Sequence, residues 1–331
     1  MNKLTINRGT IKEFGGKYTN YITFVFLFIV LGILTRGGSM QLTSLQNLVI
    51  AESVRAFAAL GVGMIIITRG IDLSIGFMVC LTTSIAASFA QNPDYSSAMY
   101  PGVNFPLFLP ILTAIAVGTL FGAFNGVLVA YAKLPPFIAT LGTMSLARGI
   151  QLIYTQAKVV GSVKDNYKAI AQGFIGPLPN LVIYVAVAAF IVWLILKHTR
   201  LGTNFYAIGG NPQAARVAGI NVEANLVVVY AIAGFLYGVA GVLQASRLGL
   251  ANSLTGQGME LDAIAAVTVG GISQSGGVGT MGGMLVGVLT MGIINYGMTY
   301  LSIDSYYQLL VKGTIIIIAV YFDMRKNARK A

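Results

Sequence analysis

The sequence predicts an all-α, polytopic membrane protein with about ten transmembrane helices in two related halves. Of its 331 residues, 56% are hydrophobic and only 9% are charged, which is too little charge to cover a soluble globule of this size. Apolar runs of roughly 20 residues, the length that crosses a bilayer, recur along the chain. A motif also recurs, "GIDLSIG" at 70–76 and "GISQSGG" at 271–277, which indicates that the two halves are related.

Ten apolar segments are the expected membrane spans. Each is too long and too uniformly apolar to be a strand of a membrane barrel, which alternates over about ten residues. All are therefore predicted to be helices: 19–35, 45–67, 73–91, 107–131, 136–155, 181–197, 226–245, 259–274, 281–301 and 307–323. They define a transmembrane domain over 19–323, with a cytoplasmic segment at 1–18 and a basic cytoplasmic tail at 324–331.

The distribution of Lys and Arg predicts the orientation, because cytoplasmic loops of membrane proteins are enriched in these residues. With the N-terminus inside, the outside receives only Arg36, Lys158, Lys164, Lys168 and Arg247. The cytoplasmic side receives Lys3, Arg8, Lys12, Lys17, Arg69, Lys133, Lys197, Arg200, Arg216, Arg325, Lys326, Arg329 and Lys330. Both termini are then cytoplasmic. The net charge of +11 reflects the topology and favours contact with anionic lipid. The basic residues are scattered and not gathered in one patch, which argues against nucleic acid as a partner.

Several kinds of site are excluded by what the chain lacks. Cys80 is the single cysteine, so disulfides and cysteine metal sites within one chain are excluded, and no metal site is predicted. There is no Walker A pattern, and the GxGxxG of Gly277, Gly279 and Gly282 lies between two apolar spans and not after a strand. We therefore expect this chain to bind no ATP and to have no catalytic residues.

Asp72 and Ser74 stand in the first copy of the repeated motif, where the third span begins. A carboxylate or hydroxyl there can accept hydrogen bonds from the first turn and suits the positive end of the helix dipole. We interpret the two residues as a helix cap and not as a proton relay.

Charged side chains inside the spans are few, and each is costly unless it is paired or faces water. Glu52 and Arg55 are three residues apart in the second span, hence on one helix face, and are expected to neutralise each other. Arg148 and Lys312 have no partner nearby in the sequence, and the candidates for them are Glu260 and Asp262.

Small residues recur every four positions in the fourth span. Such a stripe lets the backbone of another helix approach closely. The stripe consists of Ala114, Gly118, Gly122, Gly126 and Ala130, and shorter examples are Gly234 with Gly238 and Gly283 with Gly287. We predict close helix packing at all three places.

The longest predicted cytoplasmic loop, 198–225, contains a short helix of its own. Within "NPQAARVAGI", Asn211 is a cap residue, Pro212 suits the first turn, and Gly219 stops the run. The pattern by itself predicts a helix on the cytoplasmic face, which could simply connect two spans.

Several stretches together resemble the permease subunits of bacterial ABC sugar importers, the family of the ribose, xylose, arabinose and galactose permeases. They are "FYAIGGNPQAARVAGINV", "GIDLSIG", "ELDAIAAVTVGGISQSGGVGT" and "YYQLLVKGTIIIIAV". The resemblance extends over residues 45–323, and "INYGMTY" followed by "YYQLLVKG" is most similar to the galactose and methyl-galactoside members.

The resemblance implies a ten-helix subunit of the bacterial inner membrane that pairs with a second copy. It also implies a periplasmic or lipid-anchored sugar-binding protein and a cytoplasmic ATPase, to which ATP and Mg bind. The segment that docks into this ATPase would include Gly209, Gly210, Asn211, Pro212, Ala214, Ala215, Arg216 and Gly219. Small side chains at Ala214 and Ala215 suit a surface pressed into a groove, and His198 is expected to belong to a basic flank. The polar side chains hypothesised to line the substrate pathway are Asn125, Asn295 and Tyr296.

Two alternatives stay open. A permease of the same superfamily for branched-chain amino acids or nucleosides would have a similar loop. An ion-coupled secondary transporter would also have repeats and ten spans, but we expect it to show discontinuous helices around an ion site and buried carboxylates.

Overall fold

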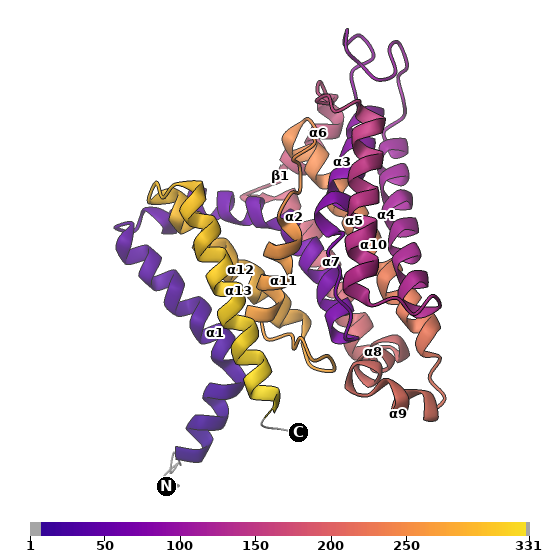
Figure 1. The fold of residues 1–331 in the computed structure, drawn as a ribbon. Helices are drawn as coiled ribbons and strands as arrows, with labels where there is room; N and C mark the ends of the chain where they lie inside the picture. Colours follow the sequence, from indigo (N-terminus) through magenta and orange to yellow (C-terminus); the bar gives the residue numbers. More distant parts are fainter. Residues whose placement is uncertain (1–7, 329–331) are drawn as a thin grey trace.

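The computed structural model describes residues 8–328, which are mainly helical (Figure 1). A 3-10 helix at Gly38–Met40 precedes α2, and β1 (Phe174–Ile175) pairs with β2 (Leu178–Pro179) in a small antiparallel hairpin. The α-helices in this part of the chain are α1 (Arg8–Leu34), α2 (Leu42–Ile67), α3 (Ile75–Phe89), α4 (Phe108–Ala130), α5 (Pro136–Thr155), α6 (Asp165–Gln172), α7 (Asn180–His198), α8 (Arg200–Gly210), α9 (Pro212–Val217), α10 (Val222–Leu248), α11 (Met259–Val269), α12 (Met281–Tyr300) and α13 (Ser305–Ala328).

Each of the ten predicted spans contains a helix: α1, α2, α3, α4, α5, α7, α10, α11, α12 and α13. Among the described helices, α2, α4, α7, α10, α12 and α13 are long and apolar enough to cross a membrane by length and composition alone. The predicted class, an all-α polytopic membrane protein, is therefore confirmed. The eighth span is shorter than predicted, because α11 ends at Val269 and is followed by Gly270 and by Gly271, which has a φ of +91°.

Helix α10 is the centre of the larger group of helices, with α4, α3 and α2 packed along it. Helices α1, α12 and α13 lie to one side in Figure 1, where α12 packs on α2, α11 and α1. Helix α2 therefore joins the two groups. Its second half, from Ala56 to Ile67, is buried on every side, as expected for a helix that is hydrophobic all round.

The glycine stripe of α4 lies against α10. A Cβ added to Gly118 would come 2.5 Å from the carbonyl oxygen of Gly234, and one added to Gly238 would come 2.7 Å from the Cα of Ile115. Both distances are too short for a real side chain, so the two backbones touch. The predicted close packing of these glycines is confirmed.

Several elements that the sequence predicts to be cytoplasmic lie at one end of the molecule. The first residues of α1 and the last residues of α13 lie toward the end that also holds α8 and α9 (Figure 1). In the described part of the chain, the start of α1, the end of α13 and the loop 198–225 are thus at one end of the helical bundle, and Lys3, Arg329 and Lys330 lie outside the described residues.

Candidate functional site

The loop 198–225 folds into two short helices with a sharp bend between them. We call residues 209–212, where α8 ends and α9 begins, the elbow. The Asn211 side chain accepts hydrogen bonds from the backbone N–H of Gln213 at 3.0 Å and of Ala214 at 3.1 Å, which caps α9. Gly219, with a φ of +83°, follows the helix. The short helix predicted from these residues is confirmed.

The elbow packs directly on the end of α2 and on the loop that precedes α12. A Cβ on Gly209 would collide with the carbonyl oxygen of Ile67 and would come 2.5 Å from the backbone nitrogen of Gly277. Gly277 in turn donates its N–H to Ile67 at 2.8 Å. Ile67 comes just before the first copy of the repeated motif, and Gly277 ends the second copy. The elbow therefore meets the end of α2 and the second copy of the motif backbone to backbone.

Arg69 ties these three segments together with its side chain. Its Nε donates to the Ser275 carbonyl and its Nη2 donates to the Gly210 carbonyl, both at 2.8 Å. The backbone of Arg69 has a φ of +65°, which is uncommon for a residue other than glycine. The sequence analysis used Arg69 only as a marker of topology. Its place directly before a Gly-Ile turn was the one signal of a local role.

The side chains of α9 divide into an inward and an outward set. Ala215 is 4% exposed and packs with Ile208 and Val222. Ala214 and Arg216 are exposed, and Val217 is 91% exposed. From the sequence, Ala214 and Ala215 are both predicted to be docking residues. The structure separates them, because Ala215 already fills the space beneath its own helix, and it adds Val217 as an apolar side chain that points outward.

Glu223, at the start of α10, holds the loop to its neighbours. Both Lys133, in the connection between α4 and α5, and Arg216, in α9, donate to its Oε1 atom. The side chains of Lys133 and Arg216 are at least half exposed, so we expect each ion pair to contribute little stability.

The turn at 70–74 contains a small buried network. Asp72 accepts from the Ser74 N–H at 2.8 Å and from the Ser74 hydroxyl at 2.6 Å. Asn125, in α4, donates to the same hydroxyl at 3.0 Å. Ser74 is the cap residue of α3, but its side chain accepts no hydrogen bond from the first turn. The structure thus places Asn125 beside Asp72 and Ser74, in closed packing between helices.

The charged residues of the spans form a chain of alternating sign. Arg55 donates to Glu52 and also lies 3.5 Å from Asp262 through its Nε atom. Lys312 of α13 lies 3.1 Å from both carboxylate oxygens of Asp262. Sequence reasoning named Asp262 as a possible partner of Lys312, and the contact is present. Arg148 does not join this chain, because its guanidinium lies over the ring of Phe77, 5.0 Å from the centroid.

A polar cavity of about 260 Å³ adjoins these charges, between α2, α12 and α13. We call it the chamber. Its lining includes Glu52, Arg55, Asn295, Tyr296, Gln308 and Lys312. Two of the three proposed pathway residues, Asn295 and Tyr296, are therefore together in one cavity, and Asn125 is not in its lining.

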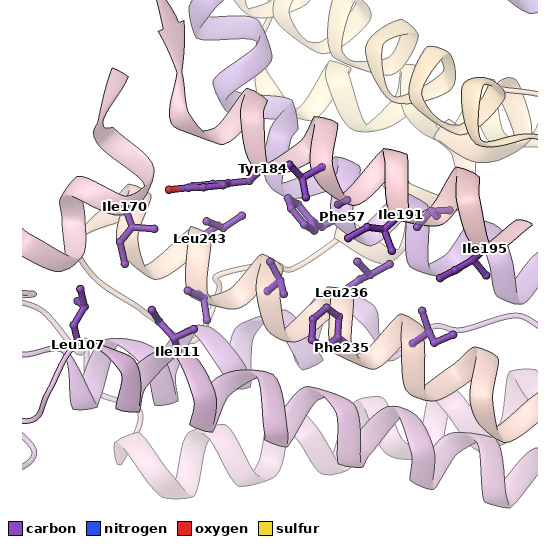
Figure 2. A pocket seen from close by; sticks show the side chains of 16 residues that line it. Phe57, Leu107, Ile111, Ile170, Tyr184, Ile191, Ile195, Phe235, Leu236 and Leu243 are labelled. Carbon is purple, nitrogen blue, oxygen red and sulfur yellow. The ribbon is translucent and has the colours of Figure 1, made fainter. Parts of the chain in front are cut away.

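A larger cavity, of about 510 Å³, lies between α2, α4, α6, α7 and α10. Figure 2 shows that the labelled side chains around it are apolar, apart from the hydroxyl of Tyr184. Such a lining offers a polar ligand almost nothing to bind. Of these two cavities, the chamber is therefore the better candidate for contact with a polar substrate.

Known proteins resemble the chain over nearly its whole length. Residues 44–320 match the family described as the permease component of branched-chain amino acid transport systems. The chain belongs to this permease family. It is 42% identical to the galactose/methyl galactoside import permease protein of Haemophilus influenzae, over 96% of this chain and 98% of that protein. It is 41% identical to the corresponding protein of Escherichia coli, over 93% and 94%, and 37% identical to a ribose import permease protein of Bacillus subtilis, over 92% of each. No solved structure matches this permease.

Proposed function

We propose that the chain is the transmembrane subunit of an ATP-driven importer that moves a monosaccharide into the cytoplasm. The substrate would be galactose, methyl galactoside or a related hexose or pentose. The strongest support is the identity of about 41–42%, over almost the full length, to permeases whose names specify galactose and methyl galactoside import. Transport, and not catalysis, is the role of a permease subunit, which agrees with the absence of a phosphate-binding motif from the sequence.

In this proposal the energy comes from a separate cytoplasmic ATPase, which binds ATP and Mg. The elbow and the outward side chains of α9 would dock on it, which places α8, α9 and both termini in the cytoplasm. A periplasmic or lipid-anchored sugar-binding protein would deliver the ligand to the opposite end. Purified by itself, the chain should hydrolyse no ATP.

A second copy of the permease would complete the translocation unit. Helix α13 supports this, because the residues of its apolar stretch are not buried by the described part of one chain. The same helix carries Gln308 and Lys312 of the chamber lining. Membrane lipid would cover the exposed apolar side chains of α4 and α5 at the periphery, such as Leu120 and Ile153.

The proposed mechanism is alternating access between outward-open and inward-open states. A partner shifts such an equilibrium only if it binds one state better than the other. ATP would favour the state in which the two ATPase domains close and move α9. The release of ADP would reset the elbow.

The main alternative is a permease for branched-chain amino acids, which the description of the matching family favours. Stimulated ATP hydrolysis separates the two. The chain is co-purified with its ATPase, placed in nanodiscs, and mixed with sugar-binding or leucine-binding protein in loaded form. The proposal expects stimulation by galactose-loaded protein and none by leucine-loaded protein, and the opposite result would establish the alternative. Transport that continues without ATP but needs an ion gradient would instead indicate a secondary transporter.

A further inference from the structure

Asn295 has an amide group that the protein does not use. Neither its Oδ1 nor its Nδ2 has a hydrogen-bond partner among the described residues, although both atoms are shielded from bulk solvent. Leaving a buried polar group unpaired costs roughly 1–3 kcal/mol. The amide lies in the lining of the chamber, on the same helix face as Tyr296 and Thr299. A buried donor and a buried acceptor beside the cavity are thus left without a partner in the described part of the chain.

The charged side chains around the chamber are, in contrast, already paired. Glu52, Arg55, Asp262 and Lys312 alternate in sign, so their formal charges sum to zero. Arg247, on α10, stands outside these pairs: its Nη1 donates to the carbonyl of Ile50, and its Nε has no partner among the described residues. A zwitterionic amino acid would have to break into these pairs to place its ammonium and carboxylate groups, which is costly in apolar surroundings. A neutral ligand would not.

We propose that the chamber is a binding subsite for a neutral polyhydroxyl ligand, in which the Asn295 amide pairs with one or two ligand hydroxyls. An amide that both donates and accepts matches a hydroxyl, which does the same. Tyr296 supplies an aromatic ring in the same lining, and such a ring suits the apolar face of a sugar. This inference rests on the proposed function, since it gives the permease itself a contact with the sugar.

The chamber lies far from the elbow, in the part of the molecule that a ligand from outside would reach first. Arg55 precedes Ile67 by 12 residues along α2, which is about 18 Å of helix. Asn295 is likewise in the last third of α12. In the proposed orientation, the subsite is therefore in the outer half of the membrane.

The first test compares three variants in the complete complex, reconstituted with its ATPase and binding protein. Asn295→Leu removes the amide, Asn295→Ser keeps a hydrogen-bonding group, and Thr290→Val is a polar-to-apolar control on the same helix, where Thr290 bonds only to its own turn. We measure galactose molecules imported per ATP hydrolysed. One lost hydrogen bond should lower this ratio about threefold to tenfold in Asn295→Leu, with a smaller change in Asn295→Ser and none in Thr290→Val. Wild-type ratios in all three would overturn the subsite. A wild-type complex that imports no sugar would overturn the proposed function instead.

The second test needs no transport. Cys80 is buried and is the only cysteine, so Asn295→Cys in a Cys80→Ala background carries a single thiol in the chamber. A membrane-impermeant maleimide should label it, and millimolar galactose should slow the labelling at least about threefold, whereas leucine should not. Failure to label, protection by leucine alone, or indifference to galactose would each contradict the proposal, even if Asn295→Leu fails to assemble.

Discussion

The elbow adjoins the last residue of α2, the chamber adjoins the middle of the same helix, and the two are built in opposite ways. At the elbow, Gly209, Ile67 and Gly277 meet through their backbones, with no space for a methyl group at Gly209. At the chamber, side chains of three helices surround open volume, and the amide of Asn295 has no hydrogen-bond partner among the described residues. Close-packed backbones move together as one body, whereas a cavity with unpaired polar groups can accept a ligand. One region is thus suited to transmitting movement and the other to contacting a passing molecule.

The largest expected effect tests whether the elbow is as tightly packed as this comparison requires. Gly209→Ala would force a methyl group into the Ile67 carbonyl, and we expect coupled transport to be nearly abolished. Inserting bulk into an ordinary core already costs about 1–3 kcal/mol, and a backbone carbonyl yields less than a side chain does. Gly210→Ala is the matched control, because nothing lies within 4 Å of a Cβ there. Sugar uptake by both variants is compared with their co-purification with the ATPase, and equal behaviour of the two would show that the elbow is not close-packed.

The next effect concerns the charges beside the chamber. Arg55→Leu should strip Glu52 and Asp262 of their shared partner, and removing one member of a buried pair typically costs about 3–5 kcal/mol. The double variant Glu52→Gln/Arg55→Leu should be more stable than the single one, since Asp262 keeps Lys312. Thermal unfolding of the purified subunit in detergent measures both. If the double variant melts at the same temperature as the single one, or lower, the two residues do not depend on each other.

A smaller effect should follow from loss of the Arg69 side chain. Arg69→Gly keeps the left-handed backbone without strain but removes the two bonds to the Ser275 and Gly210 carbonyls. We expect the subunit to fold and assemble, while the number of ATP molecules hydrolysed per imported sugar rises by about threefold. This corresponds to the loss of about 0.5–1 kcal/mol of the free energy that holds the three segments in their relative positions. The ratio is measured in proteoliposomes. An unchanged ratio would mean that the glycine contacts alone align the three loops.

The smallest expected effect is that of Arg216→Ala. Its pair with Glu223 is half exposed, so the folded subunit should lose no more than about 1 kcal/mol. If Arg216 also contacts an acidic group on the ATPase, co-purification should weaken, and added salt should weaken the wild-type complex toward the level of the variant. Salt-independent assembly of both proteins would assign Arg216 to the subunit alone.

The sequence predicted the helices well because membrane spans are marked by length and hydropathy. It also predicted the cap of α9, since Asn211 and Pro212 act on their immediate neighbours. It did not predict that Arg69 bonds across to Ser275 and Gly210, or that Ala215 faces inward while Val217 faces out. Those facts depend on how distant segments meet. Helix α11 ends before the predicted span because Gly270 and Gly271 follow Val269 and Gly271 takes a positive φ, which the span prediction from hydropathy did not use.

Uptake in proteoliposomes shows whether this permease moves a sugar at the expense of ATP. The vesicles contain the permease and its ATPase, hold ATP inside, and receive galactose-binding protein with radiolabelled galactose outside. We expect accumulation of galactose that stops when ATP or the binding protein is omitted and that does not need an ion gradient. Accumulation of leucine but not galactose, or galactose uptake that follows an ion gradient without ATP, would contradict it.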